Sequence, residues 1–156
     1  MNLLEVRYDM FTSYLDELQT ISENPIISDE KKQYLYDNIT NYEFSRWVDV
    51  YDGDVVIGFF IIGTGENCHA AADYYIQESY IKPEYRRKGH MTRAISDFIN
   101  RHVGVYCLFI LNNNQIGRVF WHVLFDRIGY VPYELADVGA ADDDCTQYGF
   151  ALREKD

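Results

Sequence analysis

Hydrophobic residues recur along this chain at two spacings, one helical and one extended. Apolar side chains every three or four residues predict four helices, over 10–22, 28–39, 91–102 and 115–128. Asn24-Pro25 is expected to end the first helix, and Ser28 to cap the second. In the last helix the spacing predicts one apolar face made of Ile116, Val119, Phe120, Val123, Leu124 and Ile128.

Runs rich in β-branched and aromatic residues predict a sheet, with strands over 44–51, 54–64, 72–81, 107–111 and 147–152. Asp52-Gly53 fits a tight hairpin turn between the first two strands. In the third strand, strict alternation puts Tyr74, Ile76, Glu78 and Tyr80 on one face. Hairpin strands followed by alternating strands and helices indicate the α/β (α+β) class, with a mixed sheet between helices.

Length and composition fit one globular domain over 1–156, since the chain has 156 residues, 47% of them hydrophobic. No apolar run reaches the roughly 18–20 residues of a membrane span, and the N-terminus lacks the basic and apolar segments of a secretion signal. Cys68, Cys107 and Cys145 show neither a zinc spacing nor a disulfide pattern. We therefore expect a cytoplasmic protein with no metal and no membrane partner.

Acidic residues outnumber basic ones, but the basic ones are unevenly placed. The chain has 25 Asp and Glu against 14 Lys and Arg, a net charge of −11, which argues against a nucleic-acid partner and favours a cationic substrate. Residues 82–93 hold five of the 14 basic residues, Lys82, Arg86, Arg87, Lys88 and Arg93. This cluster is either the seat of one anionic ligand or a solvated basic turn, and charge alone leaves both interpretations open.

The basic cluster lies where a predicted strand passes directly into a helix. The strand ends at Ile81, because Pro83 has no N–H for a central ladder, and the helix begins just after Gly89. The first N–H groups of a helix have no partners within it, and together with the helix dipole they form an anion site. Gly89 permits a positive φ and a close backbone approach. A phosphate or pyrophosphate is the expected occupant, unless Gly89 merely turns the chain.

The stretch Ile81-x-Pro83-x-x-Arg86-x-x-Gly89-x-Met91-x-x-Ala94 resembles the coenzyme-A motif of the GNAT N-acetyltransferase superfamily. The resemblance implies a GNAT-like, mostly antiparallel central sheet flanked by helices, with a splayed pair of parallel strands. It also implies that acetyl-CoA binds at Ser79, Tyr80, Ile81, Arg86, Arg87, Lys88, Gly89, His90, Met91 and Thr92. Met91 replaces a small residue of the family, so we expect crowding beside the pyrophosphate that an inward-turned side chain relieves.

A second stretch, 108–130, resembles the family's fifth strand, the Asn that follows it, the next helix and a terminal Gly-aromatic pair. The resemblance assigns Asn114 to the cofactor. The family Tyr that protonates the leaving thiolate has no counterpart, because its position falls on Trp121 or Phe125, depending on the end from which it is counted. His122 is the candidate acid, with Tyr130 and Tyr133 as alternatives.

Amine acetylation also needs a group that takes a proton from the acceptor. In the family a carboxylate on the strand before the motif often serves as this base, and the resemblance points first to Glu78 and next to Asp73. The alternative is that Glu78 is an ordinary edge or solvent-facing charge.

The sequence therefore predicts an acetyl-CoA-dependent N-acetyltransferase that transfers the acetyl group directly to a primary amine. The acceptor is expected to be a small cationic amine or an amine of a peptide or protein. The alternative from another class is a catalytically inactive CoA-binding sensor or interaction protein of the same fold. Whether the chain forms a homodimer is left open.

Overall fold

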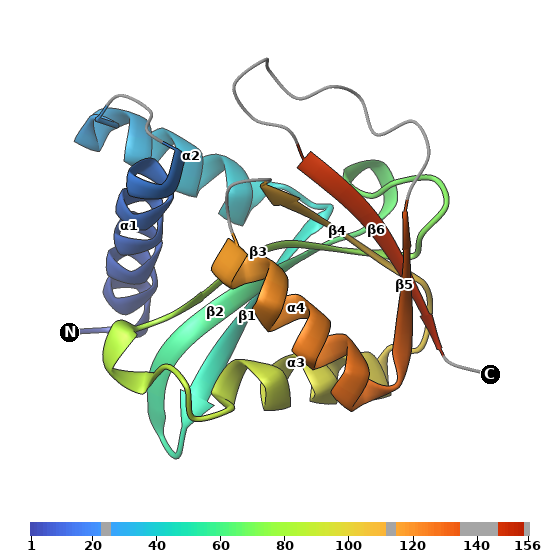
Figure 1. Ribbon diagram of the computed structural model, residues 1–156. Coiled ribbons are helices and arrows are strands. Elements are labelled where there is room, and N and C mark those ends of the chain that lie inside the picture. Colours follow the sequence, from blue (N-terminus) through green and yellow to red (C-terminus); the bar gives the residue numbers. More distant parts are fainter. Residues whose placement is uncertain (23–25, 112–114, 135–146, 155–156) are drawn as a thin grey trace.

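A computed structural model describes residues 1–22, 26–111, 115–134 and 147–154 (Figure 1). The helices in these ranges are α1 (Leu3–Ser22), α2 (Asp29–Asn41), α3 (His90–Arg101) and α4 (Gln115–Ile128), with short 3₁₀ turns η1 (Gly65–Asn67) and η2 (Pro83–Tyr85). The strands are β1 (Ser45–Asp52), β2 (Val55–Gly63), β3 (Tyr74–Ile81), β4 (Tyr106–Leu111), β5 (Tyr130–Glu134) and β6 (Gln147–Glu154). None of the helices in the described ranges is both long enough and apolar enough to cross a membrane.

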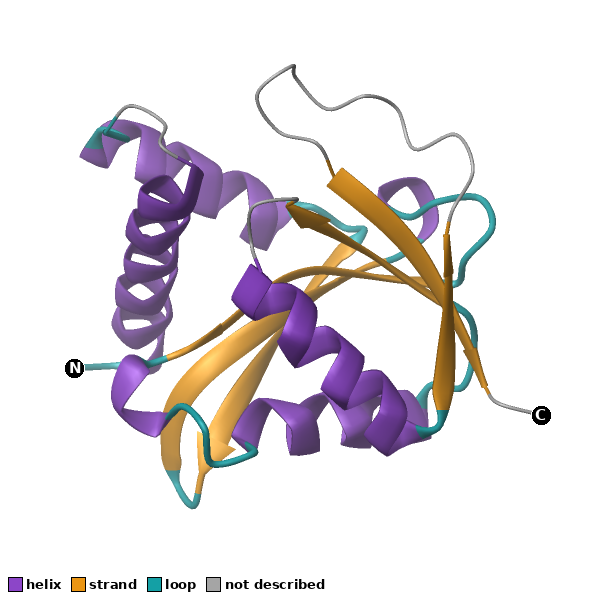
Figure 2. Cartoon of the chain, in the orientation of Figure 1, coloured by secondary structure: helices purple, strands orange, loops and turns teal. Residues whose placement is uncertain are grey.

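The six strands form one sheet in the order β1-β2-β3-β4-β6-β5. Every neighbouring pair is antiparallel except β3 and β4, which are parallel. Helices cover both faces of this sheet (Figure 2). The predicted fold class, a mixed and mostly antiparallel sheet between helices, is therefore confirmed.

Two hydrophobic cores lie on opposite faces of the sheet, and adjacent residues of β2 belong to different ones. Phe60 packs with α3 and α4, whereas Phe59 packs with α1 and α2. Phe59 stacks on Trp47 of β1 with ring centroids 4.2 Å apart. Because β2 is buried on both faces, its sequence reads as a continuous apolar run rather than an alternating one.

The N-terminus of α1 lies earlier than the periodicity predicted. The Asn2 side chain accepts from the Glu5 N–H at 2.9 Å, and the Glu5 carboxylate accepts from the Asn2 N–H at 3.0 Å. This reciprocal arrangement is a capping box, which satisfies two N–H groups and starts the helix at Leu3. The predicted cap of α2 is confirmed, since Ser28 Oγ accepts from the Lys31 N–H at 3.1 Å.

The predicted buried face of α4 is wrong in part. Val119 and Val123 are 65% and 45% exposed, while Trp121, Leu124 and Phe125 are buried at 8%, 0% and 1%. Apolar residues occupy most positions of this helix, so its spacing admits two stripes, and packing against the sheet selects the one with the larger side chains.

Strand β5 was not predicted from the sequence. It has five residues and contains Pro132, which interrupts the usual strand pattern. The sheet order explains the proline, because β5 is the edge strand beside β6 and an edge tolerates a residue without an N–H.

Candidate active site

β3 and β4 lie side by side for only part of their length. Their parallel pairing ends at Ile76 opposite Leu108, and within the described sheet 77–81 has no partner on β4. The register of β3 against β2 shifts at the same point, where Gln77 is the extra residue. A β-bulge bends its strand, so the end of β3 diverges from β4 (Figure 1). The predicted splay of the parallel pair is therefore present.

The bulge also changes which face each side chain of β3 occupies. Before it, Ile76 packs in the core under α3 and α4. After it, Tyr80 packs with α1, and Glu78 lines a cavity beside α1 and α2. The prediction that Tyr74, Ile76, Glu78 and Tyr80 share one face is wrong, because one inserted residue reverses the alternation.

The loop that follows β3 presents backbone N–H groups without acceptors. Arg87 has φ 65° and Gly89 φ 80°, and α3 begins immediately after them. In the described ranges, no protein acceptor takes the backbone N–H groups of residues 87–92. A positive φ at a non-glycine residue is uncommon and is concentrated at functional sites. Together with the positive end of the α3 dipole, such groups are suited to binding an anion.

Arg86 fixes the loop against the rest of the fold. Its Nε donates to the carbonyl oxygen of Ile81 at 2.7 Å, and its Nη2 lies 2.6 and 2.8 Å from the two carboxylate oxygens of Glu17 on α1. The guanidinium also lies 5.4 Å from the centroid of the Tyr80 ring. These contacts make Arg86 an anchor between β3, α1 and the loop.

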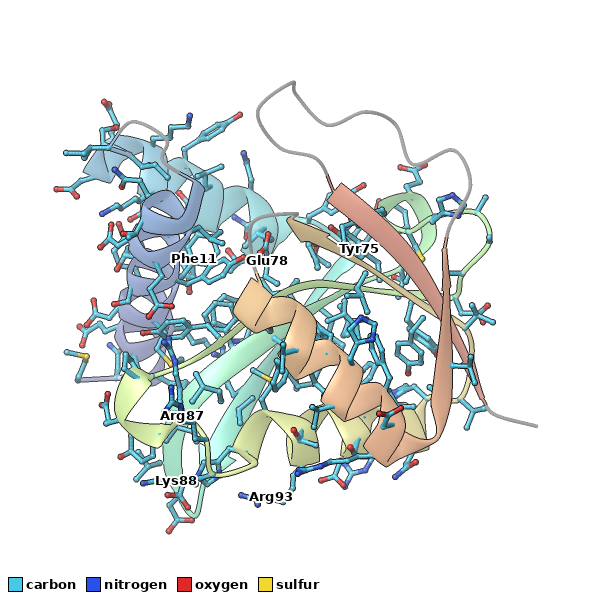
Figure 3. The ribbon with its side chains drawn as sticks, viewed as in Figure 1. Phe11, Tyr75, Glu78, Arg87, Lys88 and Arg93 are labelled. Carbon is cyan, nitrogen blue, oxygen red and sulfur yellow. The ribbon has the colours of Figure 1, made fainter. Side chains whose placement is uncertain are left out.

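Three exposed basic side chains, Arg87, Lys88 and Arg93, surround the open N–H groups (Figure 3). Arg93 donates to His90 Nδ1 at 2.8 Å and to the Lys88 carbonyl at 3.3 Å. Lys88 Nζ lies 5.8 Å from the ring centroid of Tyr85. Positive charge therefore accompanies the backbone donors at this end of β3.

The Met91 side chain turns into the core, which is the arrangement that relieves the expected crowding. It is 7% exposed and packs with the residues under α3 and α4. The carbonyl oxygen of the following residue, Thr92, accepts from Ser96 Oγ at 2.6 Å, and the Thr92 N–H has no acceptor among the described residues. The surface of the loop is therefore formed by backbone rather than by the Met91 side chain.

Glu78 lies just beyond the bulge, where β3 has left β4. Its side chain is half-buried, and no hydrogen-bond or ion-pair partner for it occurs among the described residues. Burial disfavours the charged form and raises the pKa of Glu78 to about 8. A carboxyl with a perturbed pKa in a cavity is a candidate for proton transfer.

The cavity at Glu78 has a volume of about 600 Å³, and no sequence pattern pointed to it. Phe11 of α1 and Glu78 both line it (Figure 3). The described lining residues are Phe11, Leu15, Leu35, Asn38, Ile39, Tyr42, Ser45, Asn67, Gln77 and Glu78. Asn67 Nδ2 donates to Ser45 Oγ and Gln77 Oε1, both at 2.9 Å. The described lining thus carries one carboxyl among neutral groups.

The remaining candidates lie on or near α4. Trp121 and Phe125, the two alternative positions for the family Tyr, are both buried in the core. His122 is exposed, and its ring centroid lies 6.0 Å from that of Phe125. Asn114 lies outside the described residues. No group of three or more potential metal ligands occurs in the described ranges.

A family model described as the acetyltransferase (GNAT) family matches residues 8–124. No curated protein matches the sequence. Among solved structures, an acetyltransferase from Thermus thermophilus superposes with a TM-score of 0.67 at 12% identity, covering 92% of this chain and 86% of that one.

Two further structures were determined with coenzyme A. The spermidine N-acetyltransferase from Vibrio cholerae, in complex with CoA and spermine, has a TM-score of 0.60 at 14% identity, covering 97% of this chain and 90% of that one. The PaiA N-acetyltransferase from Thermoplasma acidophilum, in complex with coenzyme A, has a TM-score of 0.53 at 15% identity, covering 98% and 92%. At these identities the structures show the fold alone.

Proposed function

Because this chain belongs to the acetyltransferase (GNAT) family and is thereby an acyltransferase, we propose that it transfers the acetyl group of acetyl-CoA to a primary amine. The observation that carries this proposal is the arrangement along the unpaired end of β3. Open N–H groups and basic side chains lie at one end of it. The carboxyl of Glu78, which has no partner among the described residues, lies at the other.

The backbone N–H groups of the loop, from Arg87 to Thr92, bind the pyrophosphate in this proposal, with the charge of Arg87 and Lys88 beside them. Arg86 holds the loop in place. The pantetheine arm follows the backbone of Ser79, Tyr80 and Ile81, which β4 leaves unpaired. Asn114, which lies outside the described residues, is a further cofactor contact in this proposal. Glu78 lies three residues from Ile81, about 10 Å along the strand.

Acetyl-CoA supplies the acetyl group in activated form, as a thioester. An amine at neutral pH is an ammonium ion and must lose a proton before its nitrogen can attack. Ionised Glu78 accepts that proton. The C–N bond then forms, the C–S bond breaks, and the departing sulfur takes up a proton. A base with a pKa of about 8 is well matched to this task near neutral pH.

His122 is the proposed donor of the proton that the sulfur takes up. It lies on the exposed side of α4, where water reaches it. A His122→Ala variant tests this role: a loss of about tenfold or more in kcat supports His122 as the acid. A kcat that stays unchanged assigns the proton to solvent.

Thermal unfolding with and without acetyl-CoA tests the cofactor, since a ligand that binds the folded state raises Tm. We expect a rise in Tm, and no shift at millimolar ligand contradicts acetyl-CoA binding. Thiol release with a panel of primary amines then tests transfer. The absence of a proton donor at Trp121 and Phe125 favours the alternative of an inactive CoA sensor, which predicts the Tm shift without thiol release.

A further inference from the structure

We infer that the acceptor is a monoamine with an apolar, aliphatic or aromatic body, and that the cavity between α1, α2 and β3 discriminates against polyamines. This inference deepens the proposed acetyl transfer and rests on it. The ammonium group meets Glu78, and the body of the amine lies against the helices.

The shape of the cavity supports an occupant of small-molecule size. Its volume of about 600 Å³ lies within the range of roughly 300–1,000 Å³ that is typical of small-molecule pockets in proteins. Phe11 and Leu15 of α1 are 3% and 7% exposed and line one wall. Leu35 and Ile39 of α2 line another. Such walls stabilise a hydrocarbon or aromatic body by removing it from water.

Among the described residues, the charge of the lining supports one cationic group. Glu78 is the one carboxyl among the described lining residues, and the polar remainder is made of neutral side chains. The carboxylates of α1 nearest in sequence to Leu15 are already paired within the chain. Asp16 binds Lys32 at 2.7 Å, and Glu17 binds Arg86 at 2.6 Å.

A second ammonium of a polyamine would therefore lie against described lining residues that offer it no counter-ion. Because burying an unpaired charge is costly, binding of the polyamine is disfavoured. The net charge of −11 attracts mono- and diamines from a distance, and more strongly the diamine. The discrimination inferred here is local, so it persists when salt screens the long-range field.

Hexylamine and cadaverine form a matched pair for the test, because a second ammonium of cadaverine replaces the terminal methyl of hexylamine at equal chain length. We expect kcat/KM for hexylamine to exceed that for cadaverine by at least about tenfold, at neutral pH and about 0.5 M NaCl. A cadaverine value equal to or above that of hexylamine overturns the inference and leaves acetyl transfer in place.

Asn38→Asp adds a carboxylate to the lining at an exposed position of α2, with almost no change in shape. We expect the ratio of kcat/KM for hexylamine to kcat/KM for cadaverine to fall several-fold in this variant. Tyr34→Asp is the control, since Tyr34 is 64% exposed on the same helix and does not line the cavity. An unchanged preference in Asn38→Asp, or an equal change in both variants, contradicts a local origin.

Calorimetric binding of the two amines to CoA-saturated protein separates this inference from the proposed reaction. Tighter binding of hexylamine supports the inference even if neither amine is acetylated. In that case only the proposed acetyl transfer to these amines is overturned, and the inference about the cavity stands. Equal binding, tighter binding of cadaverine, or binding of neither amine overturns the inference.

Discussion

The side chain of Arg86 is hydrogen-bonded to the last residue of β3, with its Nε 2.7 Å from the carbonyl oxygen of Ile81. The other end of the same guanidinium pairs with Glu17 on α1. Arg86 therefore holds the loop against β3 and α1. In the proposed function, the open N–H groups and the exposed basic side chains bind the anion.

Replacing Arg86 with Ala is expected to raise KM for acetyl-CoA about tenfold while changing kcat less, because the loop loses its anchor on β3. Steady-state kinetics at low and high ionic strength check the cause. A positioning role predicts a similar rise at both, whereas direct attraction to the anion predicts a smaller rise at high salt. Glu17→Gln is the control, since it keeps the bond to Ile81. An unchanged KM in Arg86→Ala refutes the anchor.

Gly89→Ala is expected to destabilise the protein by about 1–2 kcal/mol, because a side chain at a positive φ is strained, and also to raise KM for acetyl-CoA. The added Cβ lies 3.3 Å from Arg93 Nη1 beside the open N–H groups. Gly129→Ala is the matched control, with φ 73° and no atom within 4 Å of the added Cβ. A similar loss of stability in both variants, with a KM effect in Gly89→Ala alone, is the predicted result. Equal KM effects rule out a specific role for the loop.

The orientation of α4 predicts unequal effects of truncating two neighbouring residues. Leu124→Ala is expected to cost about 2–5 kcal/mol, because Leu124 is fully buried. Val123→Ala is expected to change stability by less than about 0.5 kcal/mol, since Val123 is 45% exposed. Urea unfolding measures both. Comparable costs at the two positions contradict the packing of this helix.

Local sequence signals predicted the loop well. Pro83 and Gly89 act through their own backbone constraints, so the end of β3, the turn and the start of α3 follow from the residues themselves. The sequence predicted crowding at Met91 unless its side chain turns inward, and the side chain does turn inward. The capping box of Asn2 and Glu5 is equally local but was not predicted, because the periodicity places the start of the helix at residue 10, although the Asn-x-x-Glu spacing is a signal for it.

The features that the sequence did not predict depend on partners far along the chain. The alternation from Tyr74 to Tyr80 fits a regular strand, and only pairing with β2 on one side and β4 on the other leaves Gln77 as an extra residue. The cavity needs two helices that approach β3 without filling the space. The contact of Arg86 with Glu17 spans 69 positions. The periodicity of apolar residues reports only on neighbours within one helix or strand, so it cannot predict contacts between residues so far apart in the sequence.

Glu78 is expected to make stability depend on pH in the direction opposite to that of a salt-bridged carboxylate. Its pKa rises from the ordinary 4.5 to about 8 on folding, so between these values the native state holds a proton that the unfolded state has lost. The free energy of unfolding therefore falls as pH rises through this window, by at most about 1.4 kcal/mol per pH unit.

Urea unfolding of the wild type and of Glu78→Gln at several pH values checks this dependence. Glutamine has the same shape and no charge, so the variant is predicted to gain stability relative to the wild type as pH increases from 5 to 9, an interval of about four units that covers most of the window. A difference between the two proteins that stays constant with pH contradicts the raised pKa.

Turnover by Glu78→Gln, measured beside its acetyl-CoA affinity, tests the proposed reaction most directly. The wild type is predicted to show kcat/KM for the amine rising with pH and an inflection near the pKa of about 8. In Glu78→Gln we expect this inflection to disappear and kcat to fall about 100-fold or more, with Kd for acetyl-CoA unchanged. A variant that binds acetyl-CoA normally and acetylates the amine at the full wild-type rate contradicts the role of Glu78 as the base.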